Sequence, residues 1–186
     1  MSTMFIDKDD VVLEIGGNIG RNSLVISSIL SESTNLVVLE SDPNVSPILK
    51  DHAKLNNFNF FVEDSALSEY PLIQSGWVTK HGTNEEGWYK VKTISYKEFI
   101  SKYPHNFNVL VLDCEGAFAN ILKSYPQILN NINKIQLEND FINSDDGDYV
   151  HNILKEKGFK VIYEATSNDV AWGKFKDKFW QFWVKK

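Results

Sequence analysis

One stretch decides the fold, and it reads Val11-Val12-Leu13-Glu14-Ile15-Gly16-Gly17-Asn18-Ile19-Gly20. A short apolar run bounded by glycine is typical of a strand that is buried on both faces. Glycines directly after such a strand let the backbone turn tightly and approach a ligand closely. We therefore predict a strand over residues 11–15, a helix over residues 22–30 and a ligand at the turn between them.

Short β-rich runs alternate with helical patterns along the rest of the chain. Further strands are predicted at residues 36–40, 58–62, 109–113, 132–137, 159–164 and 179–185. Helices are predicted at residues 46–56, 117–129 and 149–157, and Ser95 and Glu98 form a capping box that opens another. This alternation is the signature of β-α-β units, whereas the last two strands have little helical sequence between them and should pair antiparallel. The sequence predicts an α/β, Rossmann-like fold in one domain over residues 1–186. Its mostly parallel seven-stranded sheet would end in an antiparallel C-terminal hairpin and carry helices on both faces.

Residues 71–90 interrupt this alternation. They contain three glycines, and Trp77, His81 and Trp88 stand among polar residues. We predict a long loop or irregular hairpin, a kind of segment that is often functional in compact domains. Trp77 and Trp88 are candidates to cover a substrate there.

The charge and composition argue against some partners. The 186 residues carry a formal net charge of −6. A protein that neutralises phosphates needs a basic face, so we expect no nucleic-acid partner. Cys114 is the single cysteine, which fits a reducing compartment and predicts a cytoplasmic protein. No run approaches the ~20 apolar residues that span a bilayer, and residues 1–10 lack the pattern of a signal peptide. We therefore expect no membrane partner.

The spacing of the glycines indicates the kind of ligand. The dinucleotide fingerprint requires a glycine two positions after the first one, and that position is Asn18. The Gly-Lys-Ser/Thr sequence of a phosphate-binding loop is also missing. The turn instead reads acid, any residue, glycine, three residues and glycine. That is the pattern of S-adenosylmethionine (SAM) sites, where no pyrophosphate is held, and it disfavours a nicotinamide oxidoreductase. The residues predicted to bind SAM at this turn are Glu14, Gly16, Gly17, Asn18 and Gly20.

Acidic residues at the ends of the next two strands complete the predicted SAM site. Glu40 stands at a strand end 20 residues after the turn, where an ionised carboxylate can accept hydrogen bonds from both ribose hydroxyls. The third strand ends at Glu63-Asp64-Ser65-Ala66, where a carboxylate would accept from the adenine amino group. We predict Asp64 rather than Glu63 in that role. The residues that follow and would contact the adenine ring are Ser65 and Ala66.

Several of these segments resemble the FkbM family of methyltransferases. The resemblance covers about residues 11–137 and is most specific at Leu112-Asp113-Cys114-Glu115-Gly116-Ala117. Val111 and Phe118 stand where the family usually has lysine and glutamate. Besides the glycine turn, the similar segments are residues 38–44, 66–68, 91–96 and 135–138. The resemblance implies a Rossmann-like methyltransferase fold, SAM as the donor and usually O-methylation of sugars or other small molecules.

Acidic residues after the fourth and fifth strands are the candidates for catalysis. Methyl transfer to a hydroxyl needs a base, or a metal that lowers the pKa of the hydroxyl. In one hypothesis Asp113 or Glu115 is the direct base, and Asp113 also lies beside SAM. In the other, Asp113, Glu138 and Asn139 hold Mg²⁺, a hard cation that prefers oxygen ligands.

The predicted function is an O-methyltransferase that moves a methyl group from SAM to a hydroxyl of a sugar, a glycan or another small molecule. Two alternatives stay open: an N-methyltransferase of the same fold, and a catalytically idle nucleotide-binding or interaction module. An enzyme that methylates nucleic-acid bases would carry Asn/Asp-Pro-Pro-aromatic after the fourth strand, where this chain has Asp113-Cys114-Glu115-Gly116. The edge formed by residues 179–184 would allow a homodimer.

Overall fold

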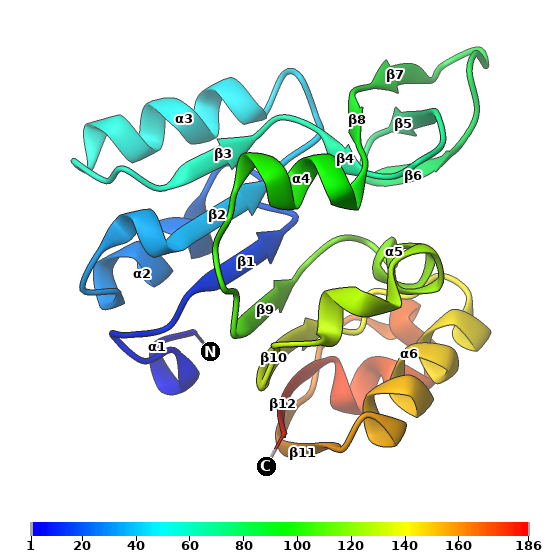
Figure 1. Ribbon diagram of the computed structural model, residues 1–186. Coiled ribbons are helices and arrows are strands. Elements are labelled where there is room, and N and C mark those ends of the chain that lie inside the picture. Colours follow the sequence, from blue (N-terminus) through cyan, green and yellow to red (C-terminus); the bar gives the residue numbers. More distant parts are fainter. Residues whose placement is uncertain (1, 186) are drawn as a thin grey trace.

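The computed structural model describes residues 2–185 and shows a central sheet with helices on both faces (Figure 1). Within these residues the sheet has seven strands in the order β11-β12-β10-β9-β1-β2-β3. Strands β3, β2, β1, β9 and β10 run parallel, and β12 pairs antiparallel with both β10 and β11. The predicted fold class is confirmed. The strands are β1 (Val12–Ile15), β2 (Leu36–Leu39), β3 (Phe61–Glu63), β9 (Val109–Leu112), β10 (Lys134–Glu138), β11 (Phe159–Ala165) and β12 (Trp180–Lys185).

The helices cover both faces of the sheet because successive strand residues point to opposite sides. In β9, Val109 and Val111 pack into one core cluster with residues of α2 and α3. Leu110 and Leu112 pack into the other cluster, with residues of α4, α5 and α6. Burial on both faces explains why these strands are continuous apolar runs. The α-helices are α1 (Ser2–Phe5), α2 (Arg21–Ile29), α3 (Ser46–Leu55), α4 (Tyr96–Lys102), α5 (Phe118–Ser124) and α6 (Ser144–Glu156).

The strand order reverses between β1 and β9. From β1 the chain proceeds to β2 and β3 on one side, and later to β9 and β10 on the other. In open α/β sheets, ligands bind at such a switch point, outside the carboxyl ends of the strands. The topology therefore directs attention to the segments that follow β1, β2 and β9.

Residues 71–90 form a regular structure, so the prediction of a long loop or irregular hairpin there was wrong in part. Strands β5 (Leu72–Ser75), β6 (Val78–His81) and β7 (Tyr89–Val91) form a three-stranded antiparallel sheet, which we call the inserted sheet. It lies between the paired strands β4 (Ala66–Leu67) and β8 (Thr93–Ile94) along the chain. Figure 1 shows it beyond the end of the main sheet. Its strands are short and mostly half-exposed, which leaves little apolar alternation to read.

Two helix boundaries also differ from the prediction. The helix expected over residues 117–129 breaks into α5 and the 3₁₀ helix η2 (Pro126–Leu129), because proline offers no N–H and disfavours the helical conformation at the residue before it. Helix α6 begins at Ser144, ahead of the expected residue 149, and the Asn143 side chain caps it by accepting from the Asp145 N–H at 3.1 Å. The predicted capping box at Ser95 and Glu98 is confirmed. The other 3₁₀ helices are η1 (Ser33–Asn35) and η3 (Val170–Lys178).

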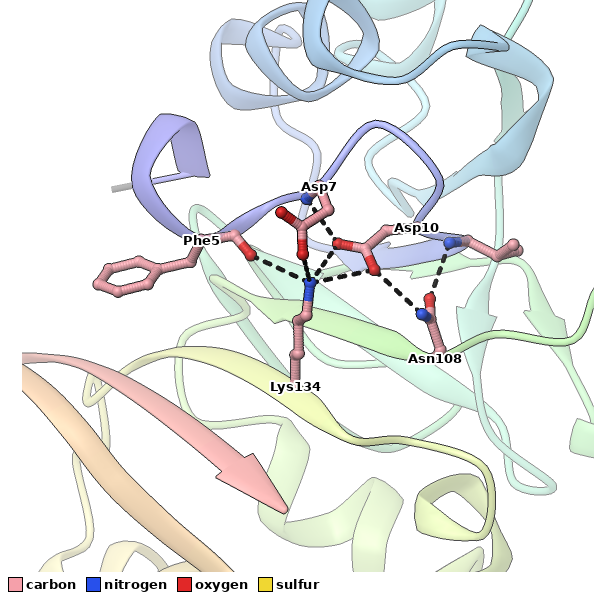
Figure 2. Close-up of polar contacts among 6 residues, drawn as sticks. Phe5, Asp7, Asp10, Asn108 and Lys134 are labelled. Atoms are coloured by element: carbon pink, nitrogen blue, oxygen red, sulfur yellow. Dashed lines mark hydrogen bonds and ion pairs between the residues drawn. The ribbon is translucent and has the colours of Figure 1, made fainter. Parts of the chain in front are cut away.

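A partly buried ionic cluster ties the amino ends of the strands together (Figure 2). Lys134 Nζ contacts Asp7 and donates to both carboxylate oxygens of Asp10 at 2.8 and 3.1 Å. Asn108 Nδ2 donates to Asp10 at 3.0 Å, while Asn108 Oδ1 accepts from the Val11 N–H at 2.8 Å. The cluster joins the starts of β1, β9 and β10. It therefore lies at the end of the sheet opposite the carboxyl ends of these strands.

Among residues 2–185, none of the helices has the length and apolar character needed to cross a bilayer.

Candidate cofactor site

A cavity of about 340 Å³ opens at the carboxyl ends of β1, β2 and β9. Its walls come from the turns after these strands, the residues after β3, the start of α5 and the inserted sheet. The structure thus brings together segments that are far apart in sequence. The predicted site residues that line the cavity are Gly16, Asn18, Glu40, Ser65, Ala66, Asp113 and Glu115. The predicted residues that lie outside its lining are Glu14, Gly17, Gly20, Asp64, Glu138 and Asn139.

The glycine turn is packed too tightly for side chains. Gly16 has φ +93°, and a Cβ on it would lie 1.6 Å from the carbonyl oxygen of Asp113. A Cβ on Gly17 would lie 2.3 Å from Val38 Cγ1. The N–H groups of Gly16 and Gly17 both donate to the Leu39 carbonyl, at 3.0 and 3.2 Å. Glycine therefore lets the backbone of β1 meet the ends of β2 and β9 at the cavity wall.

Glu14 lies beneath the turn and supports it. Its side chain is buried, and its two carboxylate oxygens accept from Asn22 Nδ2 at 2.8 Å and Ser23 Oγ at 2.5 Å. Burial raises the pKa of Glu14 to about 7. Because both partners stand in the first turn of α2, Glu14 fixes the direction in which that helix leaves the glycine turn.

Glu40 ties the glycine turn after β1 to the loop that follows β2. One carboxylate oxygen accepts from the Asn18 N–H at 2.7 Å, and the other accepts from the Asp42 N–H at 2.8 Å. Burial raises the pKa of Glu40 despite these two hydrogen bonds. Each carboxylate oxygen has a second lone pair, so the residue can accept from a pair of ligand hydroxyls while keeping its backbone contacts.

The two carboxylates after β3 point away from the cavity. Asp64 pairs with Lys92 at 2.8 Å and Lys50 at 3.8 Å, outside the cavity lining. Glu63 is buried and accepts from Lys102 at 2.7 Å and from Ser65 Oγ at 2.6 Å. Ser65 and Ala66 are the residues of this segment that reach the cavity.

Asp113 and Glu138 are neighbouring carboxyl groups beside the cavity. Burial and the nearby Asp113 charge raise the pKa of Glu138 to about 8, and burial also raises the pKa of Asp113. Near neutral pH, Glu138 therefore carries a proton, and Asp113 lines the cavity beside it.

Asp140 is one of the acidic residues after the fifth strand, and the sequence alone assigned it no specific role. Its buried carboxylate accepts from the Gly116 N–H at 2.9 Å and from the Glu115 N–H. Glu115 and Gly116 both have positive φ, 51° and 77°, so their N–H groups form a concave nest that suits an anion. Burial raises the pKa of Asp140 to about 7. Asp140 fixes the turn that presents Glu115 to the cavity, and its position two residues after the β10 end was the available signal.

The proposed Mg²⁺ ligands do not converge. Asn139 is fully buried, its Nδ2 donates to the carbonyl oxygens of Lys178 and Phe179, and its Oδ1 pairs with His151 Nε2 at 2.7 Å. Both polar atoms of the Asn139 amide are therefore hydrogen-bonded within the protein and are not available to a metal ion. Among residues 2–185 there is no group of three or more His, Cys, Asp or Glu side chains placed to hold a metal ion. The structure offers no support for the Mg²⁺ hypothesis.

The raised pKa of Glu138 makes a testable contribution to stability. Its folded-state pKa is about 8 against an ordinary value of 4.5, so the folded protein holds this proton more tightly than the unfolded chain. The contribution is fully present below pH 4.5 and is lost as the pH rises through 8. We expect Glu138→Gln to raise the free energy of unfolding at pH 9, relative to wild type, by about 1–3 kcal/mol, and to have a smaller effect at pH 5.

Urea denaturation at both pH values measures this effect. Glu86→Gln changes an exposed glutamate between β6 and β7 and should shift neither curve. An identical effect of Glu138→Gln at the two pH values would show that Glu138 does not hold its proton as described.

Comparisons with solved structures show which known proteins share this fold. No family model matches the sequence, and no curated protein is similar to it in sequence. A protein from Streptococcus mutans, described as a proposed methyltransferase and solved with S-adenosylhomocysteine (SAH), is 12% identical with a TM-score of 0.59. The alignment covers 99% of this chain and 93% of that protein.

Two further structures are described as RNA methylases. An rRNA methylase from Streptococcus thermophilus is 6% identical with a TM-score of 0.58, over 98% of this chain and 90% of that protein. A proposed tRNA methyltransferase from Streptococcus pneumoniae is 12% identical with a TM-score of 0.59, over 97% of this chain. This chain spans only 65% of the tRNA protein.

These comparisons correct one expectation and leave another untested. The expectation of no nucleic-acid partner was wrong, because proteins that share this fold are described as tRNA and rRNA methyltransferases. A net charge of −6 is therefore no ground for excluding RNA. The FkbM family is not shown by any comparison and stays a prediction. The strand order, the antiparallel β12 and these structures agree that the chain has the Rossmann-like fold of SAM-dependent class I methyltransferases.

Proposed function

We propose that the chain is a SAM-dependent methyltransferase. The observation that carries this proposal is the convergence of the glycine turn, Glu40, Ser65 and Ala66 on one cavity at the switch point of the sheet. These segments come from the ends of three neighbouring strands. An adenosine with a short amino-acid tail would contact each of them in turn, with its ribose at Glu40 and its adenine beside Ser65 and Ala66.

The charges of the cavity fit a sulfonium better than a phosphate. Glu40, Asp113 and Glu115 line it, and burial raises the pKa of each. A carboxylate whose charged form is disfavoured by burial is stabilised by a nearby cation. A pyrophosphate would face these acids without the close glycine-x-glycine approach that dinucleotide sites use, whereas SAM brings a positive sulfur.

We further propose that the acceptor atom is a hydroxyl oxygen and that Asp113 is the base. When bound, SAM supplies an electrophilic methyl group on a sulfonium. Asp113 lines the cavity, and its neighbour Glu138 has a raised pKa of about 8 and holds its own proton near neutral pH. As the acceptor oxygen bonds to the methyl carbon and the carbon–sulfur bond breaks, the hydroxyl proton would pass to Asp113. Alignment of the acceptor by the cavity walls would supply much of the rate enhancement.

Glu40 is the residue whose loss should weaken cofactor binding most directly. We expect Glu40→Ala to weaken SAH binding by about 1–3 kcal/mol, because two hydrogen bonds to an ionised acceptor are lost. Isothermal titration calorimetry measures this change.

Asp64→Asn is the matched control, because it changes the carboxylate that pairs with Lys50 and Lys92 outside the cavity. Its affinity for SAH should equal that of the wild type. Equal affinities for Glu40→Ala and wild type would remove Glu40 from the site.

We also propose that residues 1–186 act as one domain and that the protein works in the cytoplasm. SAM binding without methyl transfer to any acceptor would favour the alternative of an idle module.

A further inference from the structure

The inserted sheet contributes a large share of the cavity wall but none of the predicted cofactor contacts. Leu72 and Gln74 of β5, Thr79, Lys80 and His81 of β6, and Trp77 at the turn between them all line the cavity. Trp77 is 64% exposed. Its indole thus stands at a cavity wall with much of its surface open to solvent, where the face of the ring is free to stack on a ligand.

Two hydrogen bonds hold this sheet against the loop after β2. Ser41 Oγ donates to Gln74 Oε1 at 3.1 Å, and Tyr89 OH donates to Asp42 Oδ2 at 2.9 Å. Ser41 and Asp42 directly follow Glu40, the proposed ribose ligand. The inserted sheet is therefore positioned relative to the cofactor loop by side chains from both β5 and β7.

The same glutamine fixes the turn that carries Trp77. Gln74 is buried, and its Nε2 donates to the Gly76 carbonyl at 3.0 Å. Gly76 has φ +56°, a conformation that suits a two-residue hairpin turn. Trp77 is thus presented at the cavity by a braced turn, which reduces the entropy lost when the ring makes a contact.

The other side chains of the cavity define what could lie against the ring. Leu67, Leu72 and Ile121 provide aliphatic surface in the same cavity. Such surface suits the flat apolar face of a ring better than a saturated ring whose hydroxyl groups project from both faces, because a hydroxyl placed on it would lack a partner. An anionic group near the reacting atom would be repelled by Asp113 and Glu115. A flat, uncharged aromatic ring has an apolar face that suits the aliphatic side chains and no negative charge that the two acids would repel.

We infer that Trp77 is a specificity-determining residue and that the acceptor presents a planar aromatic ring, which stacks on the Trp77 indole. This inference rests on the proposed methyltransferase function. Two sources could supply such a ring: a base of single-stranded RNA, where the acceptor hydroxyl is on the ribose, or a free phenol-like molecule, where the hydroxyl is on the ring itself. The edge of the ring would lie within reach of the polar side chains that also line the cavity, namely Thr79, Lys80, His81, Asn120 and Ser124.

The test uses the full chain saturated with SAH, so that only the acceptor part of the cavity is open. The probes are an eight-nucleotide single-stranded RNA of mixed sequence, catechol as a free planar phenol, and myo-inositol as a saturated polyol of similar ring size. Binding is measured by calorimetry for wild type, Trp77→Ala and Trp77→Phe. Val78→Ala is the control, because Val78 is an exposed neighbour that does not line the cavity.

We expect at least one planar-ring probe to bind the wild type. Trp77→Ala should weaken that binding by about tenfold, and Trp77→Phe should restore part of it, since base–aromatic stacking has this size. Binding of the RNA would identify a nucleobase as the source, and binding of catechol alone would identify a small phenol.

Three results would overturn the inference: neither planar-ring probe binds, myo-inositol binds as tightly as the better one, or Trp77→Ala binds as Val78→Ala does. Failure to saturate the wild type with SAH would instead contradict the proposed function itself, and the inference with it. The SAH titration that precedes each experiment separates the two failures.

Discussion

Gly16→Ala is expected to lower the free energy of unfolding by about 3–5 kcal/mol, at the upper end of single substitutions. The added Cβ would lie 1.6 Å from the Asp113 carbonyl oxygen and 2.6 Å from its carbonyl carbon, and Gly16 has φ +93°. Both neighbours are backbone atoms of the segment after β9, so no side-chain rotation can relieve the clash. The turn and β9 would have to separate, and the cavity wall would separate with them. Urea denaturation and an SAH titration measure the two consequences.

Gly87→Ala is the control, because it introduces the backbone strain of a positive φ without the steric clash. Gly87 also has positive φ, +78°, but a Cβ there meets nothing within 4 Å. Gly87→Ala should lower the free energy of unfolding by about 1 kcal/mol, the cost of placing an alanine in a left-handed conformation. It should leave SAH binding unchanged. Comparable losses of unfolding free energy in Gly16→Ala and Gly87→Ala would mean that the turn after β1 does not pack against the segment after β9 as described.

Lys134→Met is expected to destabilise the protein by a similar amount, about 3–5 kcal/mol. The Asp10 side chain is 5% exposed, and Lys134 is 20% exposed. Methionine keeps the length of the side chain but leaves Asp10 charged and buried with only N–H donors around it. An uncompensated buried charge costs far more than a surface ion pair contributes. Because the cluster lies at the opposite end of the sheet from the cavity, SAH affinity at low temperature should be preserved.

Thermal unfolding at pH 7 measures this loss of stability. Asp7→Asn is the control, since Asp7 is 77% exposed, and should lower the free energy of unfolding by less than about 1 kcal/mol. A loss for Lys134→Met no larger than the loss for Asp7→Asn would show that the pairing of Lys134 with Asp10 does not stabilise the fold as described.

The main sheet could be predicted because its strands are buried on both faces. Residues such as Val37, Leu110 and Leu112 are almost inaccessible, so each strand appears in the sequence as an uninterrupted apolar run. Glu40 could be predicted for the same reason, since it ends such a run. The position of β12 between β10 and β11 was not predicted, because a run of apolar residues does not specify its neighbours.

The side chains at the strand ends could be predicted only in part. Asp64 and Glu63 are adjacent, and their orientations depend on Lys92 and Lys102, which belong to distant segments. Asp140 braces the turn at Glu115 across 25 residues, and no local pattern marks that pairing. The inserted sheet was predicted only as a loop or irregular hairpin, because its short strands carry few buried apolar residues and are also held by distant partners such as Ser41 and Asp42.

We propose that the glycine turn, Glu40 and the residues after β3 form one site for an adenosine with an amino-acid tail. Calorimetric titration of the wild-type protein with SAH, SAM and NAD tests this site. We expect saturable binding of SAH and SAM at one site per chain, with no binding of NAD at the same concentrations. Binding of NAD alone, or no binding of any of the three compounds, would contradict the proposed site.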